Sequence, residues 1–198
     1  MVDIAFFDFD GTITDTDSFT PFLYFAIDPK RLRFGRLRLA PLILGYKIGL
    51  VSGSRLRSAI FKLGFKGIDA AALISKGQTF SQQYIPNFIR PQALERIQWH
   101  LDRGDQVVVV SASIDVYLKP WCDALGLALI CSEIEVHNGQ ITGRYLNKDC
   151  SALIKKQRIL AQYQLADFNE VYVYGDTPED RDMLSLGTQK FYQWRQIN

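Results

Sequence analysis

The sequence of 198 residues has few cysteines and no long apolar run. Its three cysteines, Cys122, Cys131 and Cys150, lack the spacing of a disulfide framework or a zinc site, so we interpret them as reduced, packed thiols. The longest apolar stretch, Leu39 to Val51, contains Lys47 and is shorter than the roughly 20 residues that span a bilayer. The start of the chain lacks the basic leader and apolar run of a secretory signal. These absences predict a globular, cytoplasmic protein.

Acidic side chains are absent between Pro29 and Ile68. The same segment carries ten basic residues, namely Lys30, Arg31, Arg33, Arg36, Arg38, Lys47, Arg55, Arg57, Lys62 and Lys66. The rest of the chain holds 13 basic and 21 acidic residues, so a basic segment lies within an otherwise acidic chain. This asymmetry predicts an anionic partner for the segment. We do not expect that partner to be nucleic acid, because the acidic remainder of the chain would repel its phosphates.

Four short apolar runs predict buried strands, and segments with helical spacing separate them. The predicted strands are Ile4–Phe7, Gln106–Val110, Leu127–Cys131 and Val171–Tyr174. Apolar residues three and four positions apart predict helices within 18–86 and over 94–101, 116–125, 152–163 and 182–186. An Asn-Gly pair at 138–139, between two alternating segments, predicts a β-hairpin over 134–142.

Strands that alternate with helices are typical of the α/β class, in which helices cover a parallel sheet. We therefore predict a Rossmann-like core with a parallel sheet. The long helical stretch separates the first strand from its sister strands, which indicates a domain inserted after that strand. The predicted core covers residues 1–14 and 88–198, and the predicted helical cap covers residues 15–87. A chain of this length can form one good core and a modest appendage.

Reactive side chains follow three of the predicted strands. The three segments are Asp8-Phe9-Asp10-Gly11-Thr12, Ser111-Ala112-Ser113 and Gly175-Asp176-Thr177-Pro178-Glu179-Asp180. Because ligands bind at the carboxyl ends of parallel strands, we expect these segments to converge on one rim. Several carboxylates on one rim repel each other unless a divalent cation lies among them, and Mg²⁺ prefers oxygen ligands. A lysine at the start of a helix adds positive charge; the spacing from Cys150 favours Lys155, and Lys156 is the alternative.

Simpler explanations exist for several of these residues when each is taken alone. Thr12 and Ser111 are also residue types that cap helices. His100 and His137 have no partner at ligand spacing, and we interpret them as structural. Trp194 is interpreted as a packing residue. The order of the motifs along the chain, more than any one of them, favours a reactive site.

That order resembles the haloacid dehalogenase superfamily of phosphohydrolases. The resembling pattern is DxDGT at 8–12, a strand that ends in Ser111, a lysine at 155 and GDxxxD at 175–180. The pattern extends over the whole predicted core. The predicted cap has the place and size of the helical cap in relatives of phosphoserine phosphatase. The resemblance implies a Mg²⁺-dependent phosphatase.

The resemblance also implies covalent catalysis. Asp8 is similar to the family's nucleophile, which attacks phosphorus, and Asp10 to the general acid that protonates the leaving group and then activates water. Asp8, the backbone carbonyl of Asp10 and Asp176 would bind Mg²⁺. Asp10 also separates this sequence from dehalogenases, which lack the second aspartate, and from transport ATPases, which have threonine there.

Further residues would hold and neutralise the phosphate, again by resemblance. Thr12, Ser111 and Ala112 are similar to the residues that bind the phosphate oxygens. Lys155 is similar to the lysine that offsets the charge of nucleophile and phosphate. Asp180 would support that lysine or a water on the metal.

The cap is expected to choose the substrate, a small phosphomonoester, through Asp17 and Arg57. Asp17 lies nine residues after Asp8, where phosphoserine phosphatases have a glutamate that meets the substrate amine. The basic cap departs from those enzymes. Its stretch Pro41-Leu42-Ile43-Leu44 resembles the cap of bacterial phosphatidylglycerophosphate phosphatases. One alternative is therefore a lipid phosphatase whose cap makes peripheral contact with an anionic membrane at its inner face; an ordinary cap helix packed on its neighbours is the other.

A receiver-like signalling module, which accepts phosphate on an aspartate without processing a small molecule, is a further alternative. Such modules place their paired acids and the phosphorylated aspartate on different strands. Here Asp8 and Asp10 follow the same strand, and a cap is inserted after them. Both features favour the enzyme.

Overall fold

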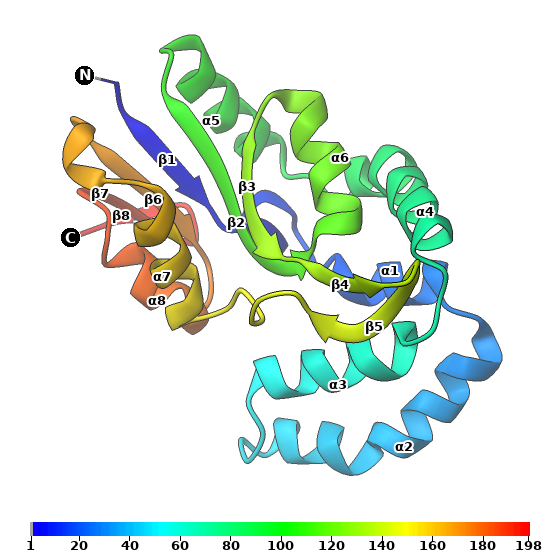
Figure 1. Cartoon of the computed structure of the whole chain (residues 1–198). Helices are drawn as coiled ribbons and strands as arrows, with labels where there is room; N and C mark the ends of the chain where they lie inside the picture. Colours follow the sequence, from blue (N-terminus) through cyan, green and yellow to red (C-terminus); the bar gives the residue numbers. More distant parts are fainter. Residues whose placement is uncertain (1) are drawn as a thin grey trace.

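A six-stranded sheet forms the centre of the computed structural model, which describes residues 2–198 (Figure 1). The strands, in their spatial order, are β3 (Ala128–Ser132), β2 (Gln106–Ile114), β1 (Ile4–Phe7), β6 (Val171–Gly175), β7 (Gln189–Tyr192) and β8 (Arg195–Ile197). Neighbouring strands are parallel except β8, which runs antiparallel to β7. The predicted α/β class with a mainly parallel, Rossmann-like sheet is therefore confirmed.

The two faces of the sheet carry separate apolar cores, and β1 contributes to both. Ala5 and Phe7 belong to one core, which includes residues of α5 (Pro91–Asp102) and α6 (Asp115–Leu125). Ile4 and Phe6 point to the other face, because strand side chains alternate. That second core includes residues of α7 (Leu153–Gln162) and α8 (Arg181–Leu184), so the sheet lies between two helical layers.

Four α-helices lie between β1 and α5. They are α1 (Phe19–Ala26), α2 (Pro29–Lys47), α3 (Gly53–Phe65) and α4 (Ala70–Gln83). Polar side chains begin three of them: Asp28, Ser52 and Asp69 each accept a hydrogen bond from the first turn of the following helix. Helix α4 packs closely on α6. Gly77 allows this approach, because a Cβ at that position would collide with the backbone of Val116. The helical insertion after β1 is thus present, and the domain limits 15–87 stay a prediction.

Helices α2 and α3 extend away from the sheet, and a β-hairpin runs above α3 (Figure 1). The hairpin consists of β4 (Ile134–His137) and β5 (Gln140–Tyr145). Its turn residues, Asn138 and Gly139, have φ values of 49° and 74°. Two consecutive positive φ angles are what a two-residue hairpin turn requires, and the Asn-Gly prediction is confirmed.

Two strand predictions differ from the structure. Strand β2 continues to Ile114, so Ser111-Ala112-Ser113 lies inside the strand and not in a turn after it. Strands β7 and β8 were not predicted, because each is very short and only half-buried or exposed, which leaves no clear apolar pattern. The three cysteines are buried and not bonded to one another, as predicted.

Candidate active site

The DxDGT segment forms a tight turn at the carboxyl end of β1. Asp8 follows the strand directly, and its backbone N–H donates to the carbonyl of Tyr174 on β6 at 2.9 Å. Gly11 has a φ of 86°, which side-chain-bearing residues rarely adopt. A Cβ at Gly11 would also collide with the carboxylate of Asp176. This glycine therefore lets the turn after β1 approach the loop after β6.

Lys155 lies in the first turn of α7 and is almost completely buried. Its ammonium donates to Asp8 and, at 2.7 Å, to Oδ1 of Asp180. Burial opposes the charge, but the two carboxylates raise the pKa of Lys155 well above its ordinary value, so it stays protonated. Lys156 instead donates to Ser185 on the surface at 2.9 Å. Of the two lysines, Lys155 is the one brought to the rim.

Three carboxylates meet beside this ammonium. Asp8, Asp176 and Asp180 each have an oxygen within 4.8 Å of the others. Burial raises the pKa of Asp8 well above its ordinary value and also raises that of Asp176. Burial acts on Asp180 too, but Lys155 and the N–H donors of Asp176 and Thr177 hold its pKa below the ordinary value. An all-oxygen cluster of this charge suits a hard divalent cation such as Mg²⁺.

Asp10 is held away from this cluster by two serines. One oxygen accepts from the backbone N–H of Ser18 at 2.7 Å, and the other accepts from the hydroxyl of Ser113. Burial, and then the negative charge of Asp17, raise the pKa of Asp10. A buried carboxyl group with a raised pKa can hold a proton near neutral pH, which a general acid must do.

The predicted phosphate-binding residues lie on β1's turn and on the neighbouring strand β2. Ser111 is fully buried. It lies on β2, two positions after Val109, which pairs with Phe7 on β1. Its hydroxyl accepts from the backbone N–H of Ser113 at 3.0 Å. The carbonyl of Ala112 accepts from Ser132 at 2.8 Å, and the hydroxyl of Thr12 donates to Asp176 at 3.1 Å.

The two predicted cap residues take part in other contacts. Asp17 is exposed and accepts from the backbone N–H groups of Phe19 and Thr20 at the start of α1. Arg57, on α3, forms ion pairs with Asp149 and with Glu179, both at 3.1 Å. Glu179 lies between Asp176 and Asp180 in the loop after β6. Arg57 therefore connects the inserted helices to the loop that carries two site carboxylates.

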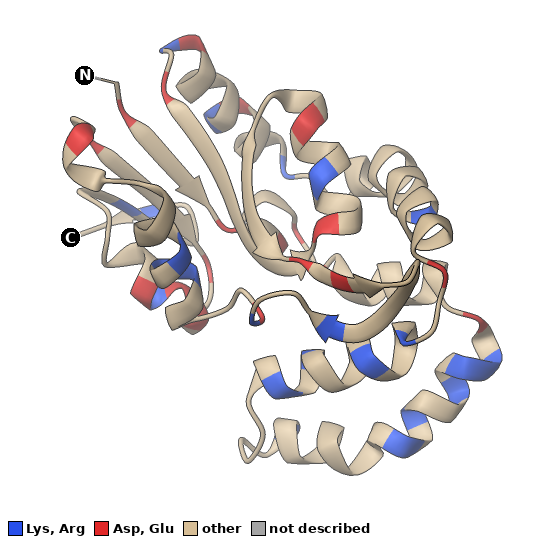
Figure 2. Cartoon of the chain, viewed as in Figure 1, with Lys and Arg blue, Asp and Glu red and all other residues tan. Residues whose placement is uncertain are grey.

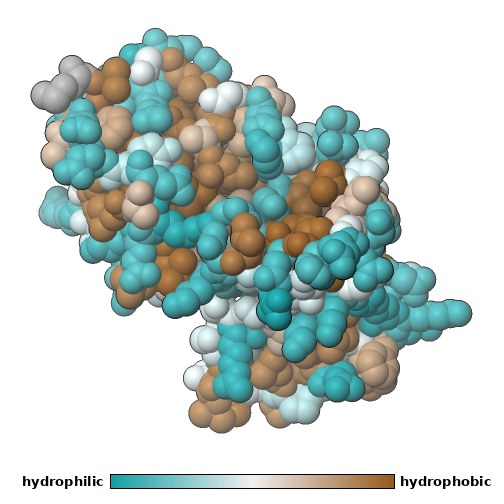
Figure 3. All heavy atoms as spheres, viewed as in Figure 1, coloured by the Kyte–Doolittle hydropathy of each residue, from teal (hydrophilic) through white to brown (hydrophobic). Residues whose placement is uncertain are grey.

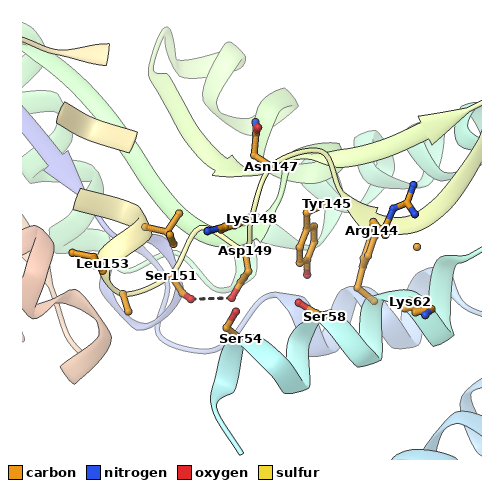
Figure 4. A pocket seen from close by; sticks show the side chains of 14 residues that line it. Ser54, Ser58, Lys62, Arg144, Tyr145, Asn147, Lys148, Asp149, Ser151 and Leu153 are labelled. Carbon is orange, nitrogen blue, oxygen red and sulfur yellow. Dashed lines mark hydrogen bonds between the residues drawn. The ribbon is translucent and has the colours of Figure 1, made fainter. Parts of the chain in front are cut away.

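A cavity of about 560 Å³ opens beside this connection (Figure 4). Ser54 and Ser58 project into it from α3, and they face Tyr145 at the end of β5 and Asp149 in the segment that follows (Figure 4). Ser151 donates to Asp149 at 2.8 Å, which fixes the carboxylate that holds Arg57. The cavity thus lies between α3 and the segment that runs from β5 to α7.

Sequence analysis missed two residues that support the site. Ser113 donates a hydrogen bond to Asp10. Because side chains two positions apart on a strand point to the same face, its spacing from Ser111 could have indicated that both serines face the site. Trp194, interpreted as a packing residue, donates from Nε1 to the carbonyl of Thr12 at 3.2 Å and also packs against Tyr174. No local pattern predicts that bond, because Trp194 lies in the unpredicted β7–β8 hairpin.

His100 lies buried behind the site. Both ring nitrogens form hydrogen bonds. Nδ1 bonds the carboxylate of Asp105 at 2.8 Å, and Nε2 bonds the hydroxyl of Tyr174 at 3.0 Å. Burial lowers the pKa of His100, so the neutral ring is favoured. These contacts agree with the structural role interpreted from the sequence.

Comparisons with known proteins identify relatives over nearly the whole chain. The family model of haloacid dehalogenase-like hydrolases matches residues 5–185. Protein CicA from Caulobacter vibrioides is 32% identical over 193 residues, which cover 94% of this chain and 84% of that protein. A protein of unknown function from Bordetella pertussis has a similar solved structure, with a TM-score of 0.80, 23% identity and coverage of 97% of this chain and 90% of that one. A phospho-aspartyl intermediate analogue of phosphoserine phosphatase has a TM-score of 0.67 at 18% identity, with coverage of 96% and 85%.

Proposed function

This chain belongs to the family of haloacid dehalogenase-like hydrolases, and we propose that it is a Mg²⁺-dependent phosphatase of small phosphomonoesters that works through an aspartyl-phosphate on Asp8. The observation that carries the proposal is the position of Lys155, whose ammonium bonds Asp8 and Asp180 beside a third carboxylate, Asp176. A nucleophile, a fixed positive charge and an oxygen-rich cation site in one place are what phosphoryl transfer requires.

In the first step, a carboxylate oxygen of Asp8 attacks phosphorus and the bond from phosphorus to the leaving oxygen breaks. Asp10 gives its proton to that oxygen, so the product leaves as an alcohol. The raised pKa of Asp10 supports this assignment, because the residue must be protonated when the ester binds. Lys155 stays charged and offsets the negative charge that reaches Asp8 and the phosphoryl oxygens.

In the second step, Asp10 accepts a proton from a water molecule whose oxygen attacks phosphorus. The bond between phosphorus and Asp8 breaks, and inorganic phosphate and the original carboxylate result. Mg²⁺, held by Asp8, Asp176 and the carbonyl of Asp10 with Asp180 in support, would neutralise the charge of the bound phosphate. Thr12, Ser111 and Ala112 are proposed to hold the phosphate oxygens.

A comparison with a solved structure supports the proposal. One solved structure of this fold is a phospho-aspartyl analogue of phosphoserine phosphatase. The ion pairs of Arg57 and the helix-start contacts of Asp17 show that both predicted specificity residues have other bonds in this structure. Contact of Asp17 and Arg57 with the leaving group stays a prediction. A receiver-like module is disfavoured, because Asp10 has the environment of a general acid.

The test is a panel of phosphomonoesters, including 4-nitrophenyl phosphate and phosphoserine, assayed with and without Mg²⁺. Hydrolysis is expected only with Mg²⁺. Asp8→Asn should lower kcat by more than about 10³-fold, because an amide cannot attack phosphorus. The matched control is Asp123→Asn, which changes an exposed aspartate paired with Lys119 and should leave kcat unchanged. Equal activity of both variants would end the covalent proposal.

A further inference from the structure

Helix α2 has an apolar side that no other element covers in the part of the chain that the structure describes. Only Gly35 is buried among its 19 residues. Leu32, Leu39 and Ile43 face α1 and α3, where they line an apolar cavity of about 390 Å³. A second apolar row, spaced by three or four residues, lies on the opposite side of the helix and consists of Phe34, Leu37, Pro41, Leu44 and Ile48.

We call this second row the outer row. Phe34, Leu37, Leu44 and Ile48 are exposed by 59%, 79%, 60% and 62%. Leu50, in the turn that follows the helix, is exposed by 78%. Figure 3 shows apolar atoms at the lower tip of the molecule, where α2 and the turn after it lie. Single exposed apolar residues need no explanation, but a continuous row along a helix indicates a partner.

Basic side chains flank the outer row on both sides. Helical geometry places Arg33 and Lys47 along one flank and Arg38 along the other. In Figure 2, the ribbons of α2 and α3 carry positions of Lys and Arg and none of Asp or Glu. Within residues 2–198, neither Arg33 nor Arg38 has a side-chain hydrogen bond or ion pair, so their charge is available to a partner.

Two other arginines of α2 are part of the fold. Arg31 donates to the carbonyls of Leu63 and Lys66 at the end of α3, at 2.9 and 2.6 Å. Arg36 donates to the hydroxyl of Tyr24. These bonds hold α2 against its neighbours, which keeps the outer row turned outward.

We propose that α2 docks this chain on the surface of an anionic membrane, with the outer row in the lipid interface and Arg33 and Arg38 at the headgroups. An apolar row between basic flanks is the pattern of helices that lie in the plane of such an interface. Across residues 2–198, no helix is long and apolar enough to cross a membrane. A second copy of the chain fits this surface less well, because two segments without any carboxylate from Pro29 to Ile68 would repel each other.

The docking surface is independent of the proposed phosphatase activity, so the two can be tested separately. The full chain is sedimented with vesicles of phosphatidylcholine alone and with vesicles that also contain phosphatidylglycerol, each at low and high salt. Binding is expected only to the anionic vesicles and should weaken as salt rises. Asp8→Asn should bind as the wild type does, whether or not the chain hydrolyses phosphate esters.

Two double variants separate the apolar contribution from the charge. Leu37→Gln with Leu44→Gln should lower partitioning by about tenfold for each leucine, because the apolar contact with lipid is lost. Arg33→Gln with Arg38→Gln should lower it by about fivefold for each arginine and reduce the salt dependence. Glutamine keeps the helix, since its helix propensity is close to that of leucine and arginine.

The matched controls are Leu160→Gln on α7, exposed by 51%, and Arg195→Gln on β8. Both should bind vesicles as the wild type does. A wild-type chain that stays in the supernatant with every vesicle overturns the proposal, and so does equal binding to neutral and anionic vesicles. A third outcome is a stable dimer of the wild type that dissociates in the double variant Leu37→Gln with Leu44→Gln. That result would identify the outer row as an interface between copies and would also overturn the proposal.

Discussion

The ammonium of Lys155 lies 2.7 Å from Oδ1 of Asp180, and this contact joins the start of α7 to the loop after β6. The same ammonium donates to Asp8, which follows β1. Three segments distant in the sequence are therefore held by one buried positive charge. Asp176 lies beside the two carboxylates that bind this ammonium, and the remaining negative charge is what a divalent cation would neutralise.

Substitution of the two adjacent lysines tests which of them serves the site. Lys155→Met should lower kcat by about 10²-fold or more, because the charge that offsets the phosphoryl group is lost. It should also lower the free energy of unfolding by about 3 kcal/mol, because the buried carboxylates lose their partner. Lys156→Met should change neither quantity. Steady-state kinetics and urea unfolding measure both, and similar losses in the two variants would contradict the assignment of Lys155.

Asp10→Asn should affect esters according to their leaving group. Nitrophenolate leaves without a proton, so formation of the phosphoenzyme from 4-nitrophenyl phosphate should persist, while hydrolysis of the phosphoenzyme slows. A burst of nitrophenolate close to one per chain is expected, followed by slow turnover. With an alkyl phosphate, both steps need Asp10 and no burst should occur. Stopped-flow absorbance tests this, and an equal slowing of the first step for both esters would show that Asp10 is not the acid.

Mg²⁺ binding should be detectable without any assay of activity. Mg²⁺ should raise the melting temperature of the wild type by several degrees, since it binds only the folded chain. Asp176→Asn should melt at a higher temperature than the wild type without metal, because one of three repelling carboxylates is removed. Mg²⁺ should then add little. Scanning calorimetry with and without the metal makes the comparison; an undiminished Mg²⁺ shift in Asp176→Asn would place the metal elsewhere.

Asp115 should make stability depend on pH. It begins α6 and accepts from the backbone N–H of Ile134 at 3.3 Å, while burial raises its pKa from 3.8 to about 6. The folded chain therefore favours the protonated form, so this residue lowers stability increasingly as pH rises from about 4 to 6. Asp115→Asn should exceed the wild type in unfolding free energy, and the excess should grow by about 1 kcal/mol between pH 5 and pH 8. Urea unfolding at both pH values measures this, and an excess that shrinks toward pH 8 would contradict the raised pKa.

The parts of the site that could be predicted from sequence are those with local signals. Asp8, Asp176 and Asp180 follow buried strands, and parallel strands bring their carboxyl ends to one edge. Lys155 could be preferred over Lys156 only from spacing. The structure distinguishes them because the first turn of α7 buries Lys155 and leaves Lys156 half-buried, with its ammonium on Ser185.

The parts that could not be predicted depend on tertiary packing. Trp194 reaches the carbonyl of Thr12 only because β7 and β8 add an edge to the sheet, and neither strand has a clear pattern of its own. Arg31 counts as one of ten basic residues in the sequence, yet its side chain binds the end of α3. The outer row of α2 is visible in the sequence, but its exposure depends on which of two apolar sides the helix turns toward α3.

The covalent step on Asp8 is the central claim, and the most direct measurement traps it. The Asp10→Asn chain is mixed with 4-nitrophenyl phosphate and Mg²⁺, quenched in acid during the burst and reduced with borohydride, which converts an aspartyl-phosphate to homoserine. Peptide mapping by mass spectrometry then locates the modified residue. The account predicts homoserine at position 8. Homoserine at another aspartate, or none in a chain whose wild type hydrolyses the same ester, would contradict it.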